Sequence, residues 1–443
     1  MDLDTTLNAF DPEERRNALS TCFGLEAGAL PEATPNFNMH MHSFFSFNAE
    51  DWSPSRIAWE SRKRGLYAAG LCDFDVLDGV REFVDAGTDL GLRVAASLET
   101  RAYYDDYATV DICSPGEPGV TYIMAAGFVD KPAADSESGR GLQLLADNST
   151  RRNIELIARV NPHLPDIAID YENDVLTLTP KAGATERHII RAYCNKSIEV
   201  FRDADRLQAF WADIFKMDGA ATAAVLASRP KWEDLVRARL VKSGGVGYEQ
   251  PSEDTFPPVR DFVKWALISD AIPMVTWLDG TSAGEADGRA LLENMKTIGC
   301  AALNIVPDRN WNIADPEQKA IKVANLRAIV AAADDLAMPV NIGTEMNKQG
   351  LPFVDDLSGD VLSEHAATFT LGAQVMVGHT NLLRFANYGY LSEQAVSDYP
   401  DAAKRNDYFA RVGALPAISR SDAAELGEKS PSAALDWFNA ALA

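Results

Sequence analysis

The chain has 443 residues, 47% of them hydrophobic, which is long enough for one large α/β barrel or for two to three ordinary domains. Its net charge of −24 excludes nucleic acid as the natural partner, because a phosphate backbone requires a basic surface, but it allows a small anionic substrate, which needs only a local group of basic side chains. No run of about 18 uncharged apolar residues occurs, so we expect no membrane span. The polar, acidic N-terminus lacks the basic and apolar regions of a signal peptide, so we expect a cytoplasmic protein. It could be a monomer or a homo-oligomer.

The predicted elements begin with a helical extension over residues 1–33, in which Asp11 is the expected N-cap and Pro12 the first helical residue. After this extension, short β-rich runs alternate with amphipathic helical segments, and this alternation is typical of parallel strands joined by crossover helices. Strands are predicted at residues 36–42, 66–74, 92–100, 120–128, 272–279, 300–307, 338–345 and 373–380. The predicted fold class is therefore α/β, a distorted TIM-like parallel barrel of seven or eight β/α units.

The alternation of strands and helices is interrupted once. Residues 131–265 are mainly helical and charged, and no Gly/Ser-rich or Pro-rich linker separates them from the rest. We expect this segment to be an insertion or cap on a barrel formed by residues 34–130 and 266–400, followed by a helical tail over 401–443. The five cysteines are scattered and include no C-x-x-C pair, so we expect neither a disulfide framework nor a cysteine zinc site.

Reactive side chains fall at the carboxyl ends of the predicted strands. His40 and His42 alternate in the first strand, so both imidazoles point to one face and can hold one ion. Six further strands end with, or are followed directly by, an acid or a histidine: Asp73, Glu99, Asp279, Asp308, Glu345 and His379. In a parallel barrel these ends share one rim, where active sites form.

The order of these motifs resembles a known family. H-x-H-S at residues 40–43 is followed by CDFD at 72–75 and by LET at 98–100. Over roughly residues 36–101 the chain resembles the polymerase and histidinol phosphatase (PHP) family. The resemblance implies a distorted barrel that binds divalent metal ions, commonly zinc, manganese or iron, and that hydrolyses phosphate esters or related esters.

The resemblance also implies roles for individual residues. His40 and His42 would bind a first metal ion, and Glu99 would bridge it to a second. His188, in the segment TERHII, is the candidate for a later ligand of the second ion. His379 is the candidate for the family's late histidine or aspartate.

Departures from the family pattern reduce the number of metal ions that we expect. The histidine of the T-D-H motif is Phe74 here, and the predicted strand at 120–128 contains no histidine. The closing D-x-H has no match, and the segment GTEMN offers Glu345 and Asn347 in its place. We therefore expect the third metal site to be lost and one or two ions, zinc, manganese or iron, to remain.

The residue types support metal-assisted hydrolysis without the resemblance. Two imidazoles with carboxylates suit Zn²⁺, Mn²⁺ or Fe²⁺, and a bound ion lowers the pKa of water from about 15.7 to about 7. Asp73, Asp75 and Asp308 are candidates for acid–base catalysis or for orienting a ligand histidine. The basic candidates for contact with a phosphate are Arg101, Lys181, Arg187, Lys348 and Arg384.

Each candidate ligand also has a purely structural interpretation. The histidine pair could form hydrogen bonds at the barrel mouth, Glu99 could pair with Arg101, and His379 could be a buried histidine bonded to backbone. His188 could belong to the first turn of a helix that Thr185 caps.

The first functional hypothesis is a metal-dependent phosphoesterase, in which metal-activated water attacks a small phosphorylated metabolite. Because a barrel fold does not determine its chemistry, amide hydrolysis and sugar isomerisation remain open. Phe74 and Asn347 leave a third hypothesis open, a non-catalytic pseudoenzyme with a degraded metal centre.

Overall fold

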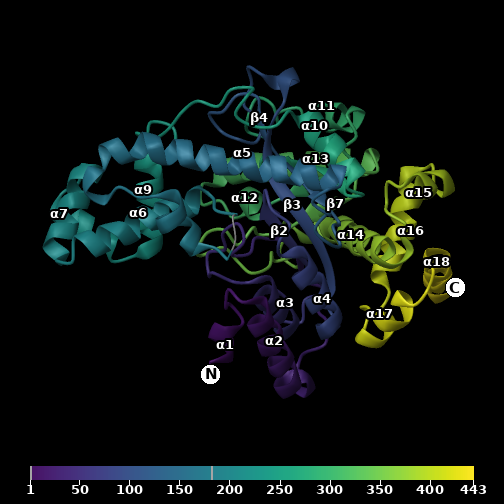
Figure 1. Cartoon of the computed structure of the whole chain (residues 1–443). Helices are drawn as coiled ribbons and strands as arrows, with labels where there is room; N and C mark the ends of the chain where they lie inside the picture. Colours follow the sequence, from purple (N-terminus) through teal and green to yellow (C-terminus); the bar gives the residue numbers. More distant parts are fainter. Residues whose placement is uncertain (1, 181–182) are drawn as a thin grey trace.

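The computed structural model describes residues 2–180 and 183–443, and its centre is a single seven-stranded sheet surrounded by helices (Figure 1). Neighbouring strands in the sheet follow one another in the chain. Their bounds are β1 (Phe37–Met41), β2 (Ala68–Phe74), β3 (Arg93–Tyr103), β4 (Val120–Ala126), β5 (Ile272–Trp277), β6 (Ala302–Ile305) and β7 (Val340–Ile342).

The sheet is a nearly closed, mostly parallel barrel. β1, β2 and β3 are parallel to one another, as are β5, β6 and β7. A parallel bridge between Met41 and Glu345 brings the end of β1 against the segment that follows β7. This closure confirms the predicted α/β class and the distorted TIM-like barrel.

The predicted strand at 120–128 exists, but the prediction that it is parallel is wrong. β4 is antiparallel to both of its neighbours, and its first residue, Val120, pairs with Tyr103, the last residue of β3. Residues 104–119 contain one short 3₁₀ turn and no crossover helix. Without a crossover the chain can only return antiparallel to β3.

The predicted eighth strand at 373–380 is wrong, because these residues lie within the helix α14 (Ala366–Ala386). α14 is long and largely buried, so its apolar residues show no clear amphipathic period, and a short apolar run within such a helix resembles a buried strand. Two glycines let its backbone approach its neighbours closely. An added Cβ at Gly372 would lie 1.9 Å from the Val340 carbonyl oxygen, and one at Gly378 would lie 1.9 Å from that of Phe409.

Helices cover the outside of the barrel and share its apolar core. Two of them begin with a capping side chain followed by proline in the first turn: Ser53 Oγ accepts from the N–H of Arg56 at 3.0 Å, and Asp315 caps the longer helix. These barrel helices are α3 (Pro54–Lys63), α4 (Val80–Leu90), α10 (Val259–Ile268), α11 (Gly288–Thr297), α12 (Asp308–Trp311), α13 (Pro316–Asp335) and α14.

Between β4 and β5 the chain forms a group of helices that extends to one side of the barrel, with α5 running across the molecule (Figure 1). Their bounds are α5 (Glu137–Val160), α6 (Glu186–Val200), α7 (Ala204–Phe215), α8 (Gly219–Leu226) and α9 (Arg229–Leu240). Most of their buried apolar residues, among them Tyr193, Trp211 and Phe215, form a core cluster of their own, whereas Leu142 and Leu145 of α5 belong to the core of the barrel. We call this group the insertion helices.

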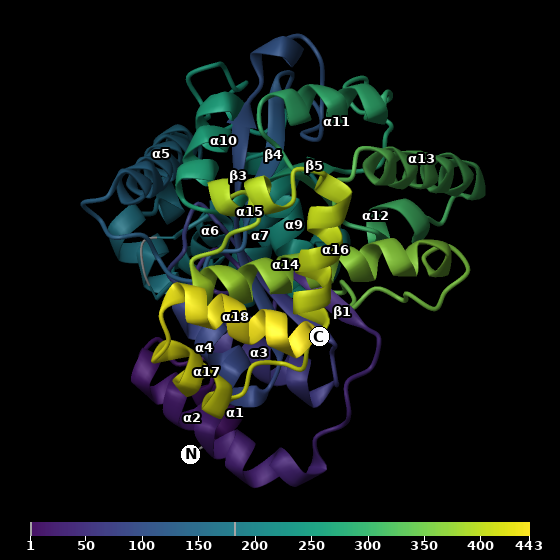
Figure 2. The ribbon, with the colours of Figure 1, turned by 90° about the vertical axis from the view of Figure 1, so that its right-hand side faces the viewer.

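Both ends of the described chain are helical. α1 (Leu3–Thr6) and α2 (Pro12–Glu26) precede the barrel, while α15 (Glu393–Asp398), α16 (Ala402–Ala414), α17 (Arg420–Gly427) and α18 (Pro431–Leu442) follow α14. Figure 2 shows α14 to α18 together on one side of the molecule. In residues 2–180 and 183–443, no helix combines the length and apolar character needed to cross a membrane. All five cysteines are buried and unpaired.

Candidate functional site

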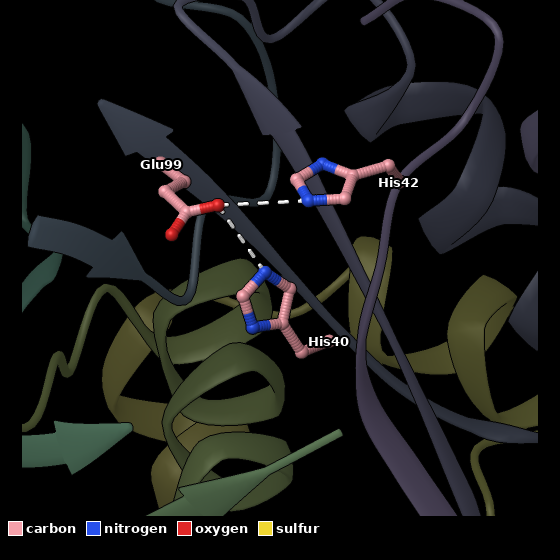
Figure 3. Close-up of side chains that lie close together, drawn as sticks. All are labelled: His40, His42 and Glu99. Atoms are coloured by element: carbon pink, nitrogen blue, oxygen red, sulfur yellow. Dashed lines mark ion pairs between the residues drawn. The ribbon is translucent and has the colours of Figure 1, made fainter. Parts of the chain in front are cut away.

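Three polar side chains meet inside the barrel. His40 and His42 come from β1 and the residue after it, and Glu99 comes from β3, two strands away (Figure 3). Glu99 Oε2 lies 3.4 Å from His40 Nε2 and 3.5 Å from His42 Nε2. The three residues are at most 2% exposed. Strand alternation places both imidazoles on the inner face, as predicted from the spacing H-x-H.

Four buried polar atoms of this trio have no hydrogen-bond partner in the described residues. Within the described residues, both ring nitrogens of His40, Nε2 of His42 and Oε2 of Glu99 are buried without one. Buried polar atoms without partners cost free energy. One ligand atom from each residue lies within 4.8 Å of the others, and two imidazoles with a carboxylate suit a divalent transition-metal ion. The donor set therefore fits the expected metal.

The ring of His42 is neutral, which is the state that binds a metal ion. Burial, together with the nearby His40, lowers the pKa of His42 to about 3. Burial also lowers the pKa of His40, but the carboxylate of Glu99 opposes this effect and leaves the pKa above its ordinary value. A metal ion bound by the trio would interact with the Glu99 carboxylate in place of the proton on His40. His40 can therefore lose this proton when a metal ion binds.

Asp73 supports the trio from behind. Its carboxylate accepts from the N–H of Ser43 at 2.7 Å, from Ser43 Oγ at 2.7 Å and from Ser46 Oγ at 2.6 Å. Ser46 Oγ in turn lies 3.4 Å from His42 Nδ1. Asp73 is 2% exposed, so this geometry favours an orienting role over acid–base catalysis.

Phe74, which stands where the PHP pattern has a histidine, closes one flank of the trio. Its ring stacks on that of His42, with centroids 5.1 Å apart and planes 11° from parallel. Tyr122 meets the same phenyl ring edge-on at 6.1 Å. This flank offers aromatic surface instead of a metal ligand.

Glu345 lies beside the trio at the point of barrel closure. Its N–H donates to the His40 carbonyl oxygen at 2.8 Å, and its carbonyl oxygen accepts from the N–H of His42 at 2.9 Å. Its carboxylate bonds Arg309 Nη2 at 3.1 Å and Asn347 Nδ2 at 3.3 Å. Burial alone would raise the pKa of Glu345, but Arg309 and the two histidines lower it to about 2. Glu345 is thus a charged neighbour that is already ion-paired.

A cavity of about 1270 Å³ opens above the trio, between the barrel and the insertion helices, and is lined by His42, Glu99 and Glu345 among others. Many of its lining residues are basic, and they come from both parts of the chain: Arg101, Arg152, Arg187, Arg237, Lys242, Arg309 and Lys348. Each of these cations has an acidic partner within 4 Å. The cavity is therefore rich in paired charges, although the whole chain is strongly acidic.

The structure brings five further predicted residues into this cavity, one of them Asp308. Asp75 accepts from Thr100 Oγ1 at 2.6 Å and from Arg152 at 3.2 Å. Arg101 pairs with Glu117 at 3.1 Å. Arg187 and Lys348 share Asp234, at 2.9 and 3.6 Å. Lys181 lies outside the described residues.

Three predicted residues do not reach the site. His188 is in the first turn of α6, where its Nδ1 accepts from the N–H of Thr185 at 3.1 Å, as the capping interpretation expected. His379 is on α14, and its Nδ1 accepts from the N–H of Tyr390 at 2.9 Å.

The displacement of His379 follows from the wrong prediction of a strand at 373–380. Its ring packs on Gly127, just beyond the end of β4, where an added Cβ would lie 1.9 Å from the ring. Since β4 is antiparallel, its last residue, Ala126, pairs with Ser97 of β3, and Gly127 lies beyond that pair, away from the carboxyl end of β3. Arg384, also on α14, pairs with Asp85 at 2.9 Å on the outside of the barrel.

Several residues of the site were not predicted from the sequence. Arg309 follows the strand at 300–307 and could have been found by the same reasoning that selected Asp308, because both stand at a strand end. Arg152, Glu186 and Arg237 lie in the insertion helices. No motif or spacing distinguishes them from the other charged residues of that segment.

No protein-family model and no curated protein matches the chain. Solved structures that are similar to it include the following two. One is an amidohydrolase from Chromobacterium violaceum with bound sulfate and no metal; it is 13% identical, with a TM-score of 0.47, and the match covers 75% of this chain and 96% of the other. The second is a proposed metal-dependent phosphoesterase from Bifidobacterium adolescentis, 17% identical with a TM-score of 0.46, and the match covers 76% and 97% of the two chains. We base the functional proposal on the residues of the site itself.

Proposed function

We propose that the protein is a metal-dependent hydrolase of the PHP type that cleaves a small phosphorylated metabolite. One observation carries the proposal: His40 and His42, at the end of β1, and Glu99, on β3, converge with buried ligand atoms that have no hydrogen-bond partner in the described residues. A trio assembled only for packing would pair these atoms with one another or with backbone.

His40, His42 and Glu99 would hold the metal ion. When bound, such an ion supplies a water molecule of lowered pKa and stabilises negative charge. His42 offers Nε2 while Ser46 contacts its Nδ1, so the ring is kept in one orientation. Phe74 covers the face of the same ring and excludes water from that flank.

The basic side chains of the cavity would bind the anionic part of the substrate. Arg101 stands two residues beyond Glu99 on β3, so its Cα is about 7 Å further along the strand on the same inner face. Arg152 and Arg237 approach from α5 and α9. Guanidinium groups match phosphate oxygens in bidentate geometry, which supports a phosphate-bearing substrate.

Asp75 is the carboxylate that we assign to proton transfer. It lines the cavity beside Glu99, whereas Asp73 is fully engaged behind His42. Thr100 and Arg152 fix its two oxygens, one by each residue. From this position it would take a proton from the attacking water and pass it to the leaving oxygen.

The decisive experiment measures metal and activity together. Purified protein, prepared without chelator, is examined by elemental mass spectrometry and then tested on phosphate esters, amides and sugars, so that the alternative chemistries are outcomes of the same test. We expect bound zinc, manganese or iron and hydrolysis of phosphate esters. In His40→Ala, bound metal and turnover should both fall by more than about tenfold, because a ligand is lost.

His163→Ala is the matched control, since this histidine lies in a short 3₁₀ turn of the insertion helices, outside the trio. It should retain metal and activity. Full turnover of His40→Ala, or purified wild-type protein that takes up no metal on reloading, would refute the proposal.

A further inference from the structure

Arg309 stands at the mouth of the barrel, on the short helix α12 that follows β6. The next residue, Asn310, is buried, and its Nδ2 donates to the Leu278 carbonyl oxygen at 2.9 Å, just beyond β5. This hydrogen bond fixes the backbone of α12 against the neighbouring strand end. The Arg309 side chain is 45% exposed and lines the same cavity as His42 and Glu99.

The guanidinium of Arg309 is committed to Glu345. Its Nη2 donates to Oε2 of Glu345 at 3.1 Å and to Oε1 at 3.4 Å, so both carboxylate oxygens face one cation. Glu345 is itself fixed, because its backbone bonds that of His40 and His42 at 2.8 and 2.9 Å. A carboxylate next to both imidazoles is thus held by an arginine.

The charges of the site explain what this ion pair does. Glu99 and Glu345 bring two negative charges into a buried place, where unpaired charge is costly. With one divalent ion at the trio the site is already net positive, and a second ion beside Glu345 would add two charges next to a fixed cation.

On the side of the trio formed by Phe74, the described residues also provide no ligand for a second ion. Phe74 stacks on His42 there and presents carbon atoms only. Glu345 is the carboxylate whose backbone bonds both His40 and His42, and Arg309 occupies its side chain.

We infer that Arg309 is a fixed cation that stands in for a second metal ion: it holds Glu345 out of the coordination sphere and limits the site to one ion. The inference rests on the proposed metal-dependent function. In this arrangement the Arg309 guanidinium provides a permanent positive charge beside the metal ion. A second metal ion would provide such a charge only while it is bound.

The test is a calorimetric titration of metal-free protein with Zn²⁺ and, separately, with Mn²⁺. Wild-type protein should bind one ion per chain. Arg309→Gln, which releases Glu345 and removes a positive charge, should bind either a second ion or the first ion at least about tenfold more tightly. Arg309→Met should behave in the same way, and Arg309→Lys, which keeps the charge, should remain within about threefold of wild type.

Two controls locate the effect. Arg327 pairs with Glu364 at 2.8 Å on the surface, outside the cavity, so Arg327→Gln should leave the titration unchanged. In a chain that already carries Glu345→Gln, adding Arg309→Gln should not create a site for a second ion, because the carboxylate that it frees is absent.

The outcomes separate this inference from the proposed function. Wild-type protein that binds no metal refutes both. Wild-type protein that binds two ions, or an Arg309→Gln protein with unchanged stoichiometry and affinity, overturns the role of Arg309 and leaves the hydrolase proposal standing. Circular dichroism spectra of each variant establish that it is folded before its titration is interpreted.

Discussion

His42 is held on two sides, and this makes it the best-defined residue of the site. Phe74 stacks on its ring, and Ser46 Oγ lies 3.4 Å from Nδ1 while donating to Asp73 at 2.6 Å. Residues that orient a ligand histidine in this way commonly affect metal affinity almost as strongly as the ligands do. At the scale of single residues, the site therefore includes groups that would never touch the ion.

Ser46→Ala tests this orientation. The variant removes a single oxygen, so Asp73 keeps its two bonds to Ser43 and the loop should stay folded. We expect the dissociation constant for Zn²⁺ to rise about tenfold, measured by competition with a chromogenic chelator. Ser197→Ala, a buried serine of the insertion helices whose Oγ donates to the Cys194 carbonyl, should leave the constant unchanged.

At the scale of elements, the barrel depends on close backbone contact between α14 and its neighbours. Gly378 allows the backbone of α14 to touch that of α16, and Gly372 allows it to touch β7. Backbone atoms cannot move aside as a flexible side chain can, so even a methyl group at these glycines forces the elements apart.

Gly378→Ala should lower the free energy of unfolding by about 3 kcal/mol, because the new Cβ would lie 1.9 Å from the Phe409 carbonyl oxygen. The measurement is urea denaturation followed by circular dichroism. Gly24→Ala, within α2, is the matched control: a Cβ there meets nothing within 4 Å, so the substitution should stabilise the protein by up to about 1 kcal/mol. Equal stability of both variants would contradict the packing argument.

At the scale of the whole molecule, charged residues join the insertion helices to the barrel across the cavity. Glu186, at the start of α6, accepts from Arg237 Nε at 2.6 Å and lies 3.2 Å from Lys242 Nζ. Arg101, on β3, also acts on it electrostatically. One carboxylate thus faces cations from both parts of the chain.

This arrangement predicts a pH dependence of stability. Burial alone would raise the pKa of Glu186, but Arg237, Lys242 and Arg101 outweigh it and lower the pKa from 4.5 to about 2. A depressed carboxyl pKa stabilises the fold above the unfolded value near 4.5, and this contribution is lost as the pH falls towards 2.

Glu186→Gln should therefore lower the free energy of unfolding at pH 7 by up to about 3 kcal/mol. The difference from wild type should shrink steadily below pH 4.5, as urea denaturation at a series of pH values would show. A difference that is constant between pH 7 and pH 3 would argue against the electrostatic origin.

The sequence alone determined those features that depend on local spacing. The alternation of short apolar runs with amphipathic helices predicted the barrel, and seven of the eight predicted strands are present. The spacing of His40 and His42 placed both rings on one face, because a strand repeats every two residues. Glu99 was found because it lies near the end of the predicted strand at 92–100, and parallel strands bring their carboxyl ends to one rim; β3 itself continues to Tyr103.

Only the tertiary structure decided which of the remaining candidates share a site. β4 turned antiparallel because residues 104–119 provide no crossover helix, and 373–380 became part of a buried helix, which carried His379 away from the trio. Arg309 and the cations of the insertion helices reached the cavity through contacts between residues far apart in the chain. Local periodicity contains no information about such contacts, since they arise from how whole elements pack and pair their charges.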